Sequence, residues 1–114
     1  MNREFVSLPS FLSNWSRLGL SDSDLRKLES DLLCNPKIGA VIKGTGRARK
    51  MRFAFENRGK SGSVRIIYVD FEVYEKIYLV SVFQKSDQAN LSASERSQIK
   101  SIIEDLEIIL DTNK

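Results

Sequence analysis

The chain has 114 residues, 41% of them hydrophobic and 29% charged, with one cysteine and no histidine. This composition suits one compact domain over residues 1–114 and leaves no room for a second. Lacking histidine and any cysteine cluster, the chain lacks the usual ligands of a zinc site and the commonest general base, so we expect no metal and no other cofactor. No apolar stretch approaches the roughly 20 residues that cross a bilayer and no signal-peptide core is present, which predicts a cytoplasmic protein without membrane contact.

The N-terminal segment predicts a strand and a helix. Residues 3–8 (REFVSL) have the character of a short strand. Pro9 suits the first turn of a helix that Gly19 ends. Phe11 and Trp15 lie at helical spacing on it, so we expect them in the core, although either could contribute to a partner's groove.

A second helix is predicted to begin at Ser21, which is followed by an acidic first turn and by leucines at helical spacing. Asn35-Pro36 ends it. Cys34, near this end, is expected to be a small buried hydrophobe. Residues 38–46 contain three glycines and predict an irregular connection into the sheet.

Three strands are predicted next. Residues 50–55 alternate between apolar and cationic side chains, the period of a strand with one buried face. A glycine-rich turn over residues 57–63 joins it to a β-branched strand at 64–71. After a second turn near 72–75, residues 76–83 (KIYLVSVF) form an apolar run that predicts a central strand buried on both faces.

The last segment predicts a polar loop over residues 84–89 and then a long helix. Ser92 and Glu95 have the spacing of a capping box, and isoleucines and leucines recur between 99 and 110 at helical spacing. The order of elements predicts an α+β fold in which two N-terminal helices and a C-terminal helix pack on a small, mainly antiparallel sheet.

The positive charge is concentrated in the middle of the chain. Residues 37–65 hold nine cations and one acid, whereas residues 1–36 carry a net charge of −1 and residues 66–114 a net charge of −4. A cationic strand face beside a glycine-rich basic turn suits the phosphates of a nucleic acid. Charge alone leaves open a merely solvated basic surface.

Several motifs in this part of the chain resemble those of RelE/HigB toxins of type II toxin–antitoxin systems, in the HigB-2-like branch of the RelE/ParE superfamily. The resemblance covers residues 5–110 in order. The matching segments are Asn35-Pro36-Lys37-Ile38-Gly39, Lys43-Gly-Thr-Gly-Arg-Ala-Arg-Lys-Met-Arg52, Arg58-Gly-Lys-Ser-Gly62, Arg65-Ile-Ile-Tyr68, Ile77-Tyr-Leu79 with Lys85, and Asn90-Leu-Ser.

The resemblance implies a microbial-RNase-like (RelE-like) fold and a ribosome-dependent endoribonuclease that cleaves messenger RNA in the A site. It also implies a cognate antitoxin, HigA-like with a helix-turn-helix domain, which blocks the toxin. Such an antitoxin must cover or distort the basic face, so we expect an acidic or helical segment to dock there or beside it. The chain departs from the family at Val69 and Phe83, where tyrosines are common, so neither position can supply a phenolic acid or base.

Ribonuclease chemistry can proceed without histidine, because RNA supplies its own nucleophile, the 2′-hydroxyl. Arg65 is the expected phosphate clamp, with a salt bridge at the sheet edge as the alternative. Lys50 and Arg52 lie on one strand face, where crowding by cations should ease proton transfer from a lysine; substrate binding is an equal alternative for both. Lys85 could act as general acid, and Tyr68 could stack on a base, supply a hydroxyl or pack in the core.

Five further cations are assigned to ribosomal RNA or messenger backbone, where they would set docking and make affinity fall steeply with salt. They are Lys43, Arg47, Arg49, Arg58 and Lys60. Two other functions stay open: a ParE-like toxin that acts on DNA gyrase, and a non-catalytic nucleic-acid-binding module. The cations retained at the expected catalytic positions argue against the first, and the lack of an exposed basic helix argues against the second.

Overall fold

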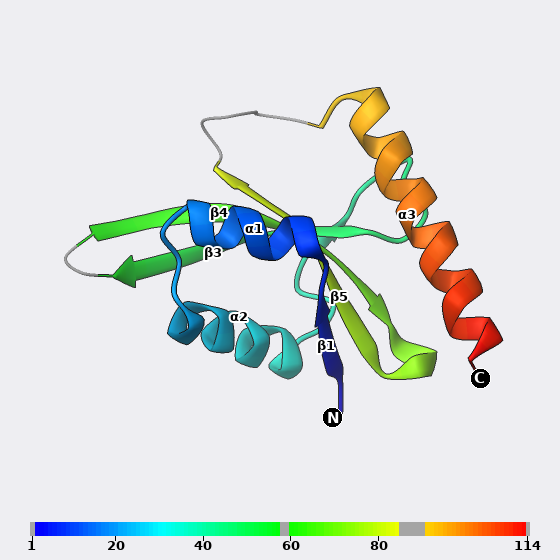
Figure 1. Cartoon of the computed structure of the whole chain (residues 1–114), viewed down its shortest axis with the longest axis horizontal. Coiled ribbons are helices and arrows are strands. Elements are labelled where there is room, and N and C mark those ends of the chain that lie inside the picture. The colour runs from blue at the N-terminus through cyan, green and yellow to red at the C-terminus, as the bar shows by residue number, and fades with distance from the viewer. Residues whose placement is uncertain (1, 58–59, 85–90, 114) are drawn as a thin grey trace.

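The computed structural model describes residues 2–57, 60–84 and 91–113 of the chain. These residues form a five-stranded sheet with α-helices on both sides and one short 3₁₀ helix (Figure 1). In chain order the elements are β1 (Glu4–Ser7), α1 (Pro9–Arg17), α2 (Asp22–Cys34), β2 (Ala40–Val41), β3 (Arg49–Asn57), β4 (Lys60–Phe71), the 3₁₀ helix η1 (Glu72–Tyr74), β5 (Lys76–Gln84) and α3 (Ala93–Thr112). The predicted α+β class is confirmed.

The strand order across the sheet is β1-β5-β4-β3-β2. β1 runs parallel to β5, and the other neighbours are antiparallel, as the sequence predicts for most of the sheet. The short strand β2 was not predicted. It lies within the expected irregular connection, where Ala40 and Val41 pair with Lys50 and Arg49.

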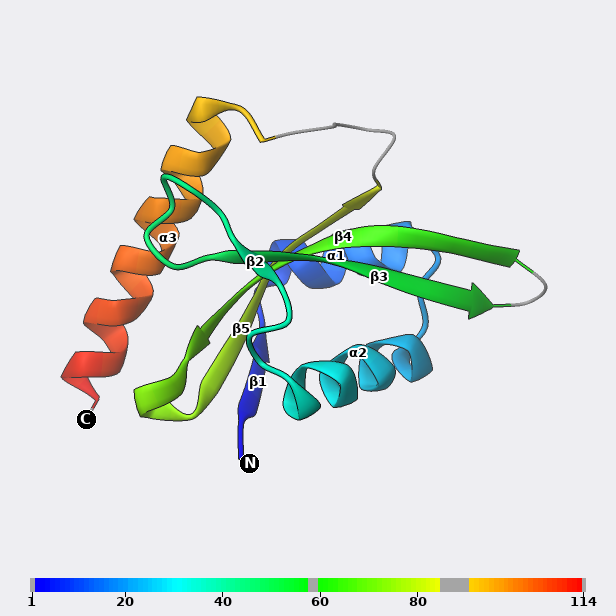
Figure 2. The same cartoon turned by 180° about the vertical axis from the view of Figure 1, so that it is seen from behind.

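Helices cover the two faces of the sheet separately (Figures 1 and 2). Helices α1 and α2 pack on one side, here called the α1–α2 face, where Phe11 and Trp15 are buried as expected. Helix α3 packs on the other side, the α3 face, against the C-terminal half of β4 and the start of β5. Strand β5 contributes to both cores, which confirms it as a strand buried on both faces.

Two capping boxes fix where the longer helices begin. Ser21 accepts the backbone N–H of Asp24, and the Asp24 carboxylate accepts the N–H of Ser21. Ser92 and Glu95 form the same reciprocal pair at the start of α3. Both caps satisfy donors that a helix N-terminus otherwise leaves unpaired. The helix start at Ser21 and the capping box at Ser92 are confirmed predictions, whereas the reciprocal bond from Ser21 to Asp24 was not predicted.

One irregularity in β5 changes which side chains reach each face. Ile67 pairs with Ser81, but the next residue of β4, Tyr68, pairs with Leu79, so Val80 is an extra residue in β5. Beyond this bulge, each side chain of β5 lies on the face opposite to the one that regular alternation would give it. Val82 therefore joins the core of the α1–α2 face, and Phe83 packs on the α3 face.

Two expectations are wrong. Strand β3 extends to Asn57 and strand β4 begins at Lys60, so the turn between them is shorter than the predicted 57–63 segment. Gly62 pairs with Phe55 within the ladder, and its missing side chain leaves room for the Phe55 ring. Cys34 is exposed rather than buried, because α2 ends there and turns its last residues toward solvent. The polar loop expected at 84–89 begins with the last residue of β5, and residues 85–89 lie outside the described part.

Candidate functional site

Three of the predicted catalytic cations lie together on the α3 face. In β3, Met51 and Phe53 are buried against the α1–α2 core, so the alternating Lys50 and Arg52 face the opposite side. Arg65 pairs directly with Arg52 across the β3–β4 ladder. The next pair on this face joins Lys50 to Ile67, so the three cations occupy adjacent ladder positions.

The electrostatics of this cationic face favour an anionic ligand. Arg52 is exposed, and Lys50 and Arg65 are half-exposed. Among the described residues, no carboxylate forms an ion pair with any of the three. Like charges directly opposite each other destabilise a strand pair, so we expect Arg52 and Arg65 to repel each other in the free protein. A bound phosphate would remove that repulsion and accept hydrogen bonds from both guanidinium groups.

Tyr68, the fourth described candidate, lies on the other side of the sheet. Its side chain is 0% exposed in the α1–α2 core. Its hydroxyl donates to the Pro36 carbonyl oxygen at 2.8 Å and accepts the Gly39 N–H at 2.9 Å. Burial raises the pKa of Tyr68, while the hydrogen bond from Gly39 acts in the opposite direction. The structure thus supports the core alternative for Tyr68 and corrects its assignment to catalysis or base stacking, since neither ring nor hydroxyl reaches the cationic face.

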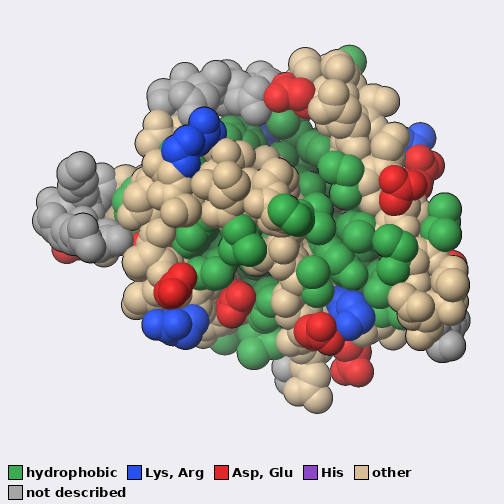
Figure 3. Space-filling view, viewed as in Figure 1, with side chains coloured by type: hydrophobic (Ala, Val, Ile, Leu, Met, Phe, Trp, Pro, Cys, Tyr) green, Lys and Arg blue, Asp and Glu red, His purple; other side chains and the backbone are tan. Residues whose placement is uncertain are grey.

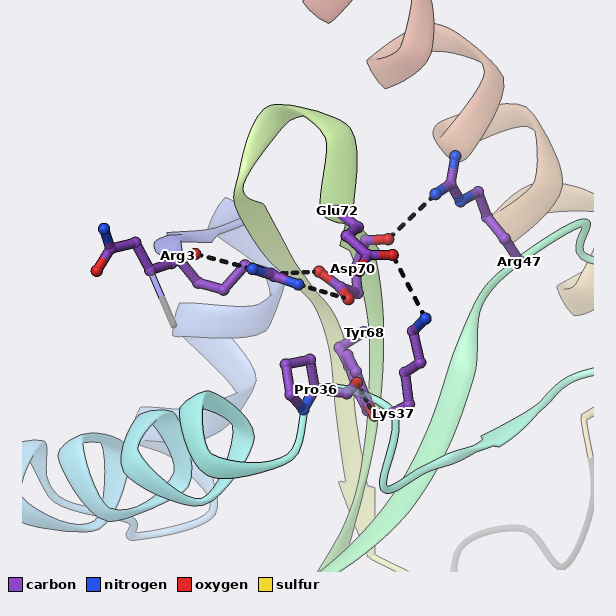
Figure 4. A network of polar contacts seen from close by, with 8 residues as sticks. Arg3, Pro36, Lys37, Arg47, Tyr68, Asp70 and Glu72 are labelled. Atoms are coloured by element: carbon purple, nitrogen blue, oxygen red, sulfur yellow. Dashed lines mark hydrogen bonds and ion pairs between the residues drawn. The ribbon is translucent and has the colours of Figure 1, made fainter.

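The Tyr68 hydroxyl explains the Asn-Pro-x-x-Gly element. It holds the segment after α2 at Pro36 (Figure 4) and also at Gly39. A side chain at Gly39 would place Cβ 2.9 Å from the Lys50 carbonyl oxygen and 3.0 Å from Tyr68 Cε1. Only glycine therefore lets this segment pack against β3 where Lys50 lies.

Two of the predicted RNA-contacting arginines hold the fold together. Arg49 donates from Nη1 to the Gly39 carbonyl oxygen at 2.7 Å. The Arg47 guanidinium lies 4.8 Å from the centroid of the Phe71 ring, donates to the Asp70 carbonyl oxygen, and pairs with Glu107 of α3 at 3.6 Å. The loop before β3 is thereby fixed to β4 and α3, and both guanidinium groups already have partners.

The structure describes only some of the remaining cations that were predicted to contact RNA or to act in catalysis. Lys43 is exposed on the loop that leads from β2 to β3. Lys60 begins β4, but its side chain is not among those described. Arg58 and Lys85 lie outside the described residues.

An ion pair that the sequence analysis missed joins the N-terminus to β4. Arg3 Nε donates to Asp70 Oδ1 at 2.7 Å and Nη2 to Oδ2 at 3.3 Å, with side chains only 5% and 4% exposed. The hydrogen bond to Asp70 raises the pKa of Arg3. Figure 4 shows Arg3, Lys37 and Arg47 approaching the Asp70–Glu72 segment from different elements. This network is structural, and its 67-residue separation gives no local sequence signal.

The side of the molecule that carries α1 has a different character. Figure 3 shows hydrophobic side chains gathered between α1 and α3, with a few cations in separate places around them. Leu12 of α1 and Ile109 of α3 are 46% and 49% exposed. Within the described residues, no helix is long and apolar enough to span a membrane, and no group of three or more acidic, cysteine or histidine side chains is placed to hold a metal ion.

The comparisons with known proteins define the class. Residues 13–113 match the model of the RelE toxin of the RelE/RelB toxin–antitoxin system. The chain therefore belongs to the RelE toxin family, whose members act with an antitoxin partner.

A solved structure agrees with this assignment. A mutant of E. coli toxin RelE in the free state superposes with a TM-score of 0.53 at 17% sequence identity, covering 78% of this chain and 90% of that chain. At this identity the similarity supports the fold, and it confirms the RelE-like architecture.

Proposed function

We propose that the protein is a metal-independent endoribonuclease of the HigB-2-like branch that cleaves messenger RNA in the ribosomal A site. The observation that carries the proposal is the cationic face, where Lys50, Arg52 and Arg65 occupy adjacent ladder positions without a described carboxylate partner. A gyrase-directed toxin would not need this arrangement. Because the chain belongs to the RelE toxin family, RNA is the polyanion that we favour as the ligand of this face.

The proposed reaction is an in-line attack by the 2′-oxygen on the adjacent phosphorus. The 2′-oxygen loses its proton, a bond forms to phosphorus, and the bond to the 5′-oxygen breaks as that oxygen gains a proton. The products are a 2′,3′-cyclic phosphate and a 5′-hydroxyl. Arg65 and Arg52 hold the phosphate oxygens and stabilise the phosphorane, because guanidinium groups stay charged throughout.

Proton transfer falls to the lysines. Among the described cations of this face, Lys50 is the lysine, and an amine can exchange a proton more readily than a guanidinium group. We therefore assign Lys50 to removal of the proton from the 2′-hydroxyl. Lys85 remains the proposed donor to the leaving 5′-oxygen. Lys43, Arg58 and Lys60 remain proposed contacts to ribosomal RNA or the messenger backbone, whereas Arg47 and Arg49 are assigned to the structural contacts described above.

The proposed partner is an antitoxin of the HigA type with a helix-turn-helix domain, which we expect to silence the toxin in the cytoplasm. Its simplest mode of inhibition is to cover the cationic face. A purified toxin–antitoxin complex should then cleave translated message far more slowly than the toxin alone, and cleavage at the full rate would contradict this part of the proposal.

Induction in growing bacteria tests the function. The wild-type chain, Arg65→Ala and the control Arg26→Ala, at an exposed position of α2, are expressed, and primer extension on an abundant message maps new ends. We expect growth arrest and cuts within translated codons for the wild type and the control, and neither for Arg65→Ala. Arrest without cuts would favour gyrase as the target, and the absence of arrest would favour a non-catalytic binding module.

A further inference from the structure

The bulge in β5 places an aromatic ring beside the cationic face. Phe83 pairs directly with Arg65, so their side chains emerge on the same face of neighbouring strands. Without the extra residue Val80, the alternation of β5 would place Val82 there instead. Phe83 packs against the α3 core and is only half-buried.

A narrow cleft lies next to this position. It lies between α3 and the sheet, with Ser10 of α1 also in its lining, and has a volume of about 170 Å³. Its apolar wall includes Ile67, Val80 and Ile99, and its polar lining includes Ser81 and the exposed Gln98. Ile67 and Ser81 are the ladder pair that follows Arg65 and Phe83 on this face, so the cleft begins about 7 Å from Arg65, two residues along a strand.

We propose that Phe83 and this cleft form a nucleobase subsite, in which the Phe83 ring stacks on a base beside the scissile phosphate and the polar lining contacts the base's edge. This inference rests on the proposed function and deepens it, since it names the residues that set nucleotide preference. The volume is below the roughly 300–1,000 Å³ of sites for drug-sized ligands, and it suits a single planar ring system.

The chemistry of the lining fits a base better than an apolar peptide side chain. Unstacked RNA bases are recognised by aromatic stacking together with hydrogen bonds to their edges. The Gln98 amide offers a donor and an acceptor, and the Ser81 hydroxyl can do both. The Glu95 carboxylate at the same rim already accepts the Ser92 N–H of the helix cap. Arg65 would hold the phosphate while Phe83, from the neighbouring strand, holds a base of the same strand of RNA.

Cleavage on ribosomes programmed with a defined message tests the subsite. We expect Phe83→Leu to raise the half-saturating concentration of programmed ribosomes about tenfold, because stacking on an aromatic ring strengthens binding of a base by roughly that factor or more. Phe83→Tyr should behave like the wild type. Gln98→Leu should change which bases flank the cuts, whereas Ser101→Leu, at another exposed position of α3, should leave the cut sites unchanged.

A second readout separates this inference from the proposed function. A short message that carries 2-aminopurine and 2′-O-methyl groups in its A-site codon is bound to ribosomes. It cannot be cut, and stacking on the toxin quenches its fluorescence. Quenching by the wild type and Phe83→Tyr but not by Phe83→Leu supports the subsite even if the wild type makes no cuts. Equal quenching by Phe83→Leu, or no quenching by any of the three, overturns it, as do unchanged cut sites in Gln98→Leu.

Discussion

Removing one of the two opposed arginines should make the free protein more stable. Arg52 and Arg65 face each other across the ladder without a described carboxylate partner, and opposed like charges cost about 0.2–1 kcal/mol. Both retain contact with solvent, so we expect Arg65→Met, which keeps most of the apolar stem, to raise the free energy of unfolding by about 0.5 kcal/mol at 10 mM salt. In a domain of this size that corresponds to a rise in Tm of about 2 °C.

Urea unfolding of a double-mutant cycle measures this repulsion. Arg52→Met should give a similar gain, and the double variant should gain less than the two single gains added, because either change removes the repulsion. The gains should vanish at 1 M salt, where the Debye length falls to about 3 Å.

A control at the other end of β4 should show the opposite sign. Lys37→Met breaks the exposed Lys37–Glu72 pair at 3.4 Å and should lower the free energy of unfolding by about 0.3–0.5 kcal/mol. If Arg65→Met is less stable than the wild type at 10 mM salt, or if its gain is unaffected by salt, the guanidinium groups do not oppose each other and the account of the cationic face fails.

Four further predictions concern the framework behind this face. Tyr68→Phe leaves the Pro36 carbonyl and the Gly39 N–H unpaired and should lower the free energy of unfolding by about 2–3 kcal/mol in urea, yet the folded variant should still cleave RNA. Because burial raises the pKa of Tyr68, the folded state holds its proton more strongly, so stability should fall as pH rises above about 10, the ordinary pKa of tyrosine, and this part of the fall should be missing in Tyr68→Phe. Gly39→Ala should cost about 1–3 kcal/mol by crowding the Lys50 carbonyl, and a variant as stable as the wild type would contradict the packing described. Arg3→Met should cost about 3–5 kcal/mol in the same assay, since it leaves the Asp70 carboxylate buried without its partner.

The sequence predicted most of the fold because its strongest signals are local. The alternation in residues 50–55 correctly places Lys50 and Arg52 on one face, and the capping residues Ser21 and Ser92 correctly mark the starts of two helices. Strand β2 carries no such signal, since two residues cannot show alternation. Its position depends on the contact between Gly39 and Tyr68, which are 29 residues apart.

The candidate site was harder to predict, because it depends on register. Strand β4 is buried on both faces over residues 66–71, so the hydropathy pattern does not tell whether Tyr68 shares a face with Lys50. The pairing of Arg49 with Tyr68 settles that it does not. In the same way, the continuous apolar run of β5 hides the bulge at Val80, which determines that Phe83 rather than Val82 lies beside Arg65.

The most direct test of the central claim is cleavage of a message that lacks one 2′-hydroxyl. Purified toxin is added to ribosomes programmed with a defined message, and the same message is prepared with a 2′-deoxynucleotide at the mapped cut. Cleavage through the RNA's own nucleophile predicts 2′,3′-cyclic phosphate and 5′-hydroxyl ends on the natural message and no cut at the substituted position. Cleavage of the substituted message at the same position, or 5′-phosphate ends, would contradict it.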